Sequence, residues 1–79
     1  MNKKRELKRI EDDRAANLDR FATYSDIIQI ALDKSDECIK NGERVKAETY
    51  TEIACFLIQK RRECIDELND IIKRLEGLV

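Results

Sequence analysis

One internal helix-breaking signal, the Asn41-Gly42 pair, divides this chain of 79 residues into two stretches of similar length. Glycine just past a helix end adopts the left-handed conformation without the clash that a Cβ atom would bring. Proline is absent and glycine occurs only once more, beside the C-terminus, so a sheet of several strands would lack turn residues. The sequence therefore predicts an all-α fold, with helices over about 4–40 and 44–76 and a turn at 41–43.

Two other helix boundaries also fit the sequence. The segment 49–52 reads Thr-Tyr-Thr-Glu, the form of a capping box, and would start the second helix at residue 49. Val45 and Ala47 continue the apolar pattern upstream, which favours the longer helix. The Asp12-Asp13 pair can likewise cap a first helix that begins late, which would leave residues 1–9 as a loose basic arm.

Apolar and small residues recur at alternating intervals of three and four, the pattern of helices that pack lengthwise. In the first predicted helix this seam consists of Leu18, Phe21, Ser25, Ile28, Leu32, Ser35 and Ile39. In the second it consists of Ile53, Leu57, Cys64, Leu68, Ile71, Leu75 and Leu78, with Lys60 or Arg61 interrupting it. The pattern predicts a single domain, residues 1–79, folded as an antiparallel two-helix hairpin that resembles a coiled coil.

Folding the chain back at Gly42 places residues whose numbers sum to about 85 opposite each other. Apolar residues then meet in the pairs Leu7–Leu78, Ile10–Leu75, Leu18–Leu68, Phe21–Cys64, Ile28–Leu57 and Leu32–Ile53. One mixed level sets Ser25 against Lys60 or Arg61, and near the open end Asp12 and Asp13 come level with Lys73 and Arg74. This register is the main structural prediction from the sequence.

A second apolar stripe remains outside the seam. It consists of Tyr24, Ile27, Ile30 and Ala31 in the first helix and Ile58, Ile65, Ile72 and Val79 in the second. Each large side chain left in water forgoes about 1.5–3 kcal/mol, which a small domain can rarely spare. We therefore expect a second copy to cover Tyr24, Ile27, Ala31, Ile58, Ile65, Ile72 and Val79, giving a homodimeric four-helix bundle. A groove or helix of a different protein is the alternative cover.

The charges are balanced overall, with 16 basic and 17 acidic residues and a net charge of −1, which excludes a globally basic nucleic-acid binder. Two local clusters are basic: residues 3–9 and Lys60-Arg61-Arg62. They support the alternative of a dimeric RNA- or DNA-binding bundle, or else local charge pairing. The stem of Arg61 can also pack at the seam while its guanidinium reaches Asp19 or Asp26.

Other charged and aromatic residues are candidates for partner binding. Asp12, Asp19, Asp26 and Asp33 repeat at intervals of seven, either as a surface for a basic partner or as a solvated outer face. Phe56 lies off both stripes, either as an interface anchor or as part of the dimer packing. The full set of candidates is Phe56, Lys60, Arg61, Arg62, Asp19, Asp26 and Asp33.

Catalytic and cofactor-binding groups are not recognisable. Histidine is absent, no Gly-rich phosphate loop occurs, and Cys38, Cys55 and Cys64 have neither metal-site spacing nor a base beside them. We expect Cys38 and Cys64 to face the core, and three unpaired thiols predict a reducing cytosol. The sequence thus predicts no enzyme, no metal and no cofactor.

The start of the chain does not read as a secretory signal, because acidic residues follow the basic ones. The longest apolar run, residues 53–58, is far shorter than the roughly 20 residues of a membrane span. We therefore expect a soluble cytoplasmic protein with no membrane partner. Its expected role is that of a small regulator or adaptor that binds protein through helical surfaces.

Overall fold

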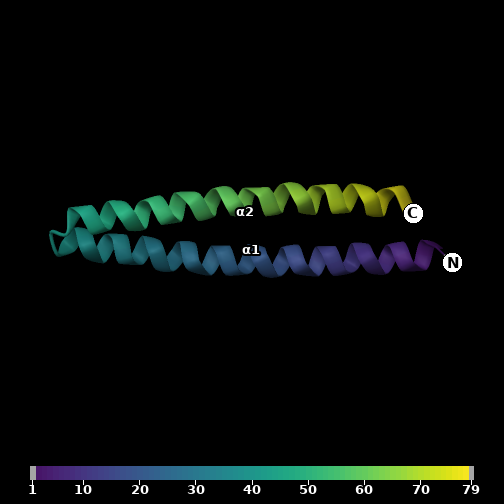
Figure 1. The fold of residues 1–79 in the computed structure, drawn as a ribbon, viewed down its shortest axis with the longest axis horizontal. Coiled ribbons are helices and arrows are strands. Elements are labelled where there is room, and N and C mark those ends of the chain that lie inside the picture. The colour runs from purple at the N-terminus through teal and green to yellow at the C-terminus, as the bar shows by residue number, and fades with distance from the viewer. Residues whose placement is uncertain (1, 79) are drawn as a thin grey trace.

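The computed structural model describes residues 2–78 as two long helices, α1 (Asn2–Lys40) and α2 (Arg44–Leu78). The helices lie side by side along their length, with the turn at one end and both termini at the other (Figure 1). The Cα trace extends over 62 × 14 × 12 Å. The predicted all-α helical hairpin is therefore confirmed.

The turn is built by the glycine that the sequence indicates. Gly42 has a φ of 75°, in the left-handed region. The Glu43 amide donates to the Cys38 carbonyl at 2.8 Å and the Gly42 amide donates to the Ile39 carbonyl at 3.1 Å. These two bonds form a Schellman motif, which satisfies carbonyls that the end of a helix leaves free.

Both helices begin early. Thr49 does not cap α2, because its Oγ1 donates to the Val45 carbonyl at 3.1 Å inside the helix. At the start of α2, Lys46 Nζ lies 2.9 Å from Glu43 Oε2, and the hydrogen bond and charge of Glu43 raise the pKa of Lys46. Residues 2–9 are helical and exposed, so they form the first turns of α1 rather than a separate arm.

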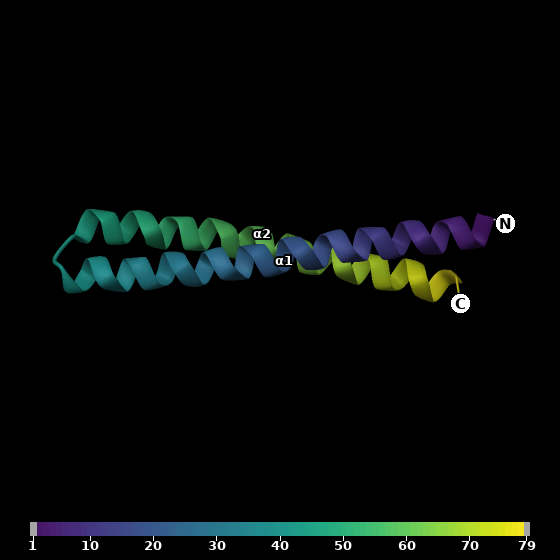
Figure 2. The same ribbon diagram turned by 90° about the horizontal axis from the view of Figure 1, so that it is seen from below.

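The interior is one heptad seam, in which positions a and d of each helix face the other helix. In α1 these positions are Leu7, Ile10, Arg14, Asn17, Phe21, Tyr24, Ile28, Ala31, Ser35 and Cys38. In α2 they are Ala47, Tyr50, Ala54, Leu57, Arg61, Cys64, Leu68, Ile71, Leu75 and Leu78. All of these side chains are buried or half-buried except Leu7 and Arg14. The helices wind around each other at mid-length, as a seven-residue repeat requires (Figure 2).

Five predicted seam positions are wrong by one residue. Tyr24 occupies the seam in place of Ser25, which lies half-buried at the edge, and the other four residues are exposed. Leu18, Leu32, Ile39 and Ile53 are 45%, 40%, 63% and 42% exposed. Their neighbours Asn17, Ala31, Cys38 and Ala54 occupy the seam instead. Hydrophobicity favours the larger residue of each pair, but small side chains fit between facing helices where there is little room. The predicted burial of Cys38 and Cys64 is confirmed.

Polar residues in the seam are satisfied within the hairpin. Near the turn, Ser35 Oγ donates to the Ala47 carbonyl at 3.1 Å and lies 2.9 Å from Thr51 Oγ1. Thr51 Oγ1 in turn donates to the same carbonyl at 3.0 Å. Across residues 2–78, no buried side-chain nitrogen or oxygen lacks a hydrogen-bond partner. The seam therefore fixes the register near the turn without leaving an uncompensated polar group.

We predict that Gly42→Val destabilises the hairpin by about 1–2 kcal/mol, because a β-branched residue must then adopt the left-handed conformation. Urea unfolding followed by circular dichroism measures the change. Gly77→Val is the matched control, since a Cβ at this helical glycine meets no atom within 4 Å and no positive φ is imposed. Equal loss of stability in the two variants would contradict the prediction.

Candidate functional site

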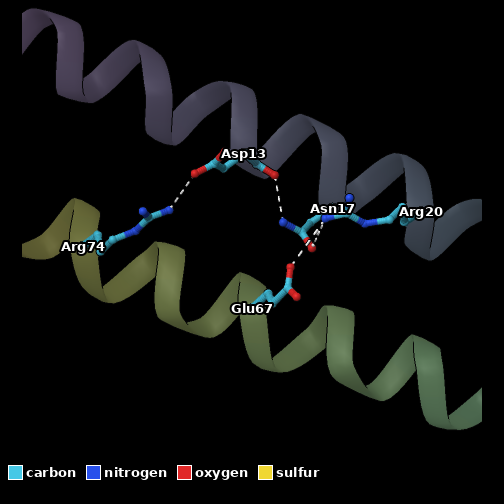
Figure 3. A network of polar contacts seen from close by, with 5 residues as sticks. All are labelled: Asp13, Asn17, Arg20, Glu67 and Arg74. Atoms are coloured by element: carbon cyan, nitrogen blue, oxygen red, sulfur yellow. Dashed lines mark hydrogen bonds and ion pairs between the residues drawn. The ribbon is translucent and has the colours of Figure 1, made fainter.

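One long edge of the hairpin carries a network of ion pairs. Arg74 Nη2 lies 3.0 Å from Asp13 Oδ2, and Arg20 Nη2 lies 3.4 Å from Glu67 Oε2 (Figure 3). These four side chains, the ionic edge, come from heptad position g of each helix, and g meets g in antiparallel pairs. The predicted proximity of Asp13 and Arg74 is confirmed.

Asn17 connects this network to the seam. Its Nδ2 donates to the Asp13 carbonyl at 2.9 Å, and its Oδ1 accepts a hydrogen bond from Arg20 Nη2 at 2.9 Å (Figure 3). The amide is buried while the ionic side chains are about half exposed. Each exposed pair stabilises the fold by less than about 1 kcal/mol, so the network mainly specifies register.

Exchanging the charges of one pair tests this register. We expect Glu67→Arg to destabilise the hairpin by about 0.5–1 kcal/mol, because it places two guanidinium groups together beside Arg20. The double variant Glu67→Arg with Arg20→Glu should recover most of the loss. A double-mutant cycle of unfolding free energies at low salt measures the coupling between Arg20 and Glu67. Additive effects of the two single substitutions would show that these side chains do not interact.

The opposite edge is apolar. Heptad position e of α1 carries Leu18, Ser25, Leu32 and Ile39, and position e of α2 carries Thr51, Ile58, Ile65 and Ile72. The six large side chains of this set, Leu18, Leu32, Ile39, Ile58, Ile65 and Ile72, form what we call the aliphatic face. Ile58 is half-buried and the other five are exposed. In antiparallel pairs e meets e, so both helices contribute to this one face.

A hollow of about 680 Å³ lies at the turn end of the aliphatic face. Its lining comes from both helices and the turn. It combines Ser35, Ile39, Gly42, Ala47 and Thr51 with the charged residues Arg44, Glu48 and Glu52. The small side chains at 42, 47 and 51 leave the space open. Ile39, which lines this hollow, is the most exposed member of the aliphatic face.

Arg61 lies in the seam, beside the middle of this face. Its Nη1 donates to Ser25 Oγ at 3.2 Å and its Cζ lies 5.7 Å from the centre of the Phe21 ring. The predicted level of Ser25 against Arg61 is therefore confirmed. The expected contact with Asp19 or Asp26 is not formed, and no carboxylate within residues 2–78 pairs with Arg61. Arg61 is thus half-buried and forms no ion pair with any residue of the described range.

A smaller apolar group lies on the same edge as the ion pairs, nearer the turn. Position g continues from Asp13 and Arg20 to Ile27, and from Arg74 and Glu67 to Ile53. Position c adds Ile30 and Phe56, the next column outward on each helix. We call Ile27, Ile30, Ile53 and Phe56 the turn-side patch. Ile30 is 57% exposed and Phe56 is 62% exposed.

The residues of the predicted dimer interface do not form one continuous surface in the structure. Ile58, Ile65 and Ile72 lie on the aliphatic face, whereas Ile27 lies on the turn-side patch at the other edge. Ala31 is buried between the helices and Tyr24 is half-buried in the seam. Val79 lies outside the described residues. Sequence reasoning missed Leu18, Leu32 and Ile39, which the heptad repeat would have found once Ala31 and Cys38 were assigned to the seam.

The predicted partner-binding residues are also dispersed. Asp19, Asp26 and Asp33 lie exposed along the outer surface of α1, where Gln29 Nε2 donates to Asp33 Oδ1 at 2.9 Å. The basic cluster does not form one patch, because consecutive helical residues point about 100° apart. Lys60 lies at position g, Arg61 in the seam and Arg62 at position b beside the aliphatic face.

Thiols and carboxylates are the metal-binding side-chain types of this chain, because histidine is absent. Cys38 and Cys64 are free and buried, and Cys55 is free and exposed. Within residues 2–78, no three Cys, Asp or Glu side chains come together in a way that would hold a metal ion. Neither α1 nor α2 contains a stretch apolar enough to cross a membrane. The two apolar surfaces, the aliphatic face and the turn-side patch, are the candidate functional sites.

Comparison with known proteins adds no family. No protein-family model matches the chain, and no curated protein or solved structure matches it significantly.

Proposed function

We propose that this chain is a non-enzymatic protein-binding module that pairs with a second copy through the aliphatic face. Two hairpins joined in this way form a four-helix bundle, and the dimer acts as a small regulator or adaptor through the surfaces left outside. The observation that carries the proposal is the aliphatic face itself: six large apolar side chains on one edge, which the two helices of the hairpin cannot cover.

The exposed area supports the need for a partner. The chain exposes 6356 Å², whereas an average folded monomer of 9.3 kDa exposes about 5,000 Å². The excess of roughly 1,400 Å² exceeds the roughly 800 Å² that each partner buries in a standard interface. A second hairpin of equal length can cover the face from end to end, which a small globular partner cannot.

The surroundings of the aliphatic face suit a dry interface. Position b, the next column outward, is mostly small or uncharged over residues 15–29 of α1 and 55–69 of α2. The residues there are Ala15, Ala22, Gln29, Cys55, Arg62 and Asn69. Acidic residues concentrate instead on the far side of α1, in the column of Asp19 and Asp26. Interfaces between copies are likewise depleted of charge at their centre.

A dimeric nucleic-acid-binding bundle is the second candidate function, and the exposed basic residues of the segment 3–9 favour it. Its second cluster is weaker support, since residues 60–62 point to different sides of α2. Such binding weakens steeply with salt. A gel-shift experiment with RNA and DNA at low salt separates the two candidates, and absence of a shift would eliminate this one.

The proposal places the protein in a reducing compartment such as the cytosol. Cys38, Cys55 and Cys64 are all free, and Cys55 is exposed next to the aliphatic face. An exposed thiol beside an interface would cross-link copies in an oxidising compartment.

Replacing one residue of the aliphatic face tests the dimer. We expect Ile65→Asp to convert the dimer to monomer or unfolded chain, because a carboxylate would enter a dry interface. Light scattering with circular dichroism measures mass and helicity. Ile30→Asp is the matched control on the opposite edge and should stay dimeric. The proposal fails if wild type is a folded monomer at micromolar concentration, or if Ile65→Asp remains dimeric.

Arg61 gives an independent test of what covers the face. A half-buried charge without a counter-ion costs free energy when it is covered, and apolar replacement is then often stabilising by about 1–4 kcal/mol. We expect Arg61→Met to tighten the dimer at least about tenfold, since 1.4 kcal/mol is a factor of ten. Analytical ultracentrifugation measures the dissociation constant. Weaker pairing would mean that a carboxylate of the covering molecule binds Arg61.

A further inference from the structure

The series of ion pairs along the ionic edge is interrupted toward the turn. Asp13 pairs with Arg74, and Arg20 pairs with Glu67, seven residues further along each helix. The next two levels of the same columns set Ile27 against Lys60 and Lys34 against Ile53. Lys60 and Lys34 thus each face an isoleucine of the other helix. Arg74 and Arg20, at the corresponding positions nearer the termini, each face a carboxylate.

The two lysines of these levels therefore lack a carboxylate on the opposite helix. Lys60 Nζ lies 5.5 Å from the centre of the Phe56 ring and 3.5 Å from Glu63 Oε2 of its own helix. That pair has i,i+3 spacing and is about half exposed, so it is weak. Lys34 forms no ion pair with any residue in the range 2–78. Both lysines border the turn-side patch by position, because each lies one heptad from an isoleucine of its own helix at position g.

The size of the patch limits what can cover it. Together with the two lysines, the patch covers only residues 27–34 of α1 and residues 53–60 of α2. At 1.5 Å per residue, each segment is about 10 Å long, or two helical turns. A second copy needs roughly 800 Å² from each partner, more than a patch of this length offers. The occupant must therefore be short.

We propose that the turn-side patch binds a short amphipathic helix of another protein, whose apolar side is bordered by carboxylates that pair with Lys34 and Lys60. The bound segment lies lengthwise between α1 and α2 as a third helix, with its apolar side on Ile27, Ile53 and Phe56. Phe56 is the anchor, because an exposed aromatic ring offers large contact area at little conformational cost. Aligned helices pack at about 20°, so the bound helix can contact α1 and α2 over the length of the patch.

The diagonal placement of the lysines specifies the sequence of the bound helix. Lys34 lies on α1 at the level of Ile53, and Lys60 lies on α2 at the level of Ile27. These levels are one heptad apart, or about 10 Å. The bound helix should therefore carry one carboxylate on each border of its apolar stripe, offset from each other by about seven residues.

This inference does not depend on the dimer, because the turn-side patch and the aliphatic face lie on opposite edges of the hairpin. The probe is a fluorescein-labelled amphipathic peptide of about five helical turns, with leucine at the heptad core positions and glutamate on both borders. The control peptide carries lysine in place of glutamate. Fluorescence anisotropy with the full chain measures both dissociation constants at low salt.

We expect the glutamate peptide to bind at least tenfold more tightly than the lysine peptide. Phe56→Ala should weaken its binding at least tenfold, and circular dichroism should show that this exposed substitution leaves the helices intact. The double variant Lys34→Glu with Lys60→Glu should reverse the preference between the peptides. Ile72→Ala, on the aliphatic face, is the control and should bind like wild type.

Three results would overturn the inference. One is no binding of the glutamate peptide, and another is equal binding of both peptides. The third is binding that survives Phe56→Ala but is lost in Ile72→Ala, which would put the peptide on the aliphatic face. Light scattering of Phe56→Asp keeps the two proposals apart: loss of the dimer in this variant would mean that a second copy occupies the turn-side patch.

Discussion

The heptad seam between α1 and α2 determines the position of every other feature of the molecule. Once Ile28, Ala31, Ala54 and Cys64 face inward, the repeat assigns each remaining residue to one of two edges or to the outer surfaces. The turn at Gly42 fixes which levels meet. All heptad positions follow one repeat, so moving the buried positions by one residue would change which residues lie on both edges.

The seam also explains why so much apolar surface stays outside. Near the turn it contains the small residues Ala31, Ser35, Cys38, Ala47 and Ala54, which remove little area from water. The larger aliphatic side chains lie one position away, on an edge. A narrow seam and a broad, exposed apolar edge are therefore two consequences of the same heptad register.

The sequence predicted the hairpin, its turn and two levels at which the helices meet, because these depend on long-range regularities. The predicted pairs Leu18–Leu68 and Leu32–Ile53 are wrong, since Leu18 and Leu32 are exposed on the aliphatic face. The break at Gly42, the level of Ser25 with Arg61 and the pairing of Asp13 with Arg74 each follow from counting along the chain. Sequence reasoning did not predict which of two adjacent columns is buried. The columns containing Ala31 and Leu32 are both largely apolar, and hydrophobicity alone favours the larger side chain.

That one-residue difference changes the functional interpretation. With Leu32 in the seam, Ile27 and Ile65 belong to one continuous stripe and imply one partner. With Ala31 in the seam, Ile27 and Ile65 lie on opposite edges and imply two separate surfaces. The composition of the edges differs as well, since aliphatic residues dominate one, while cations border the apolar group on the other. A second copy on the aliphatic face would leave the turn-side patch open, so dimerisation and binding of another protein need not compete.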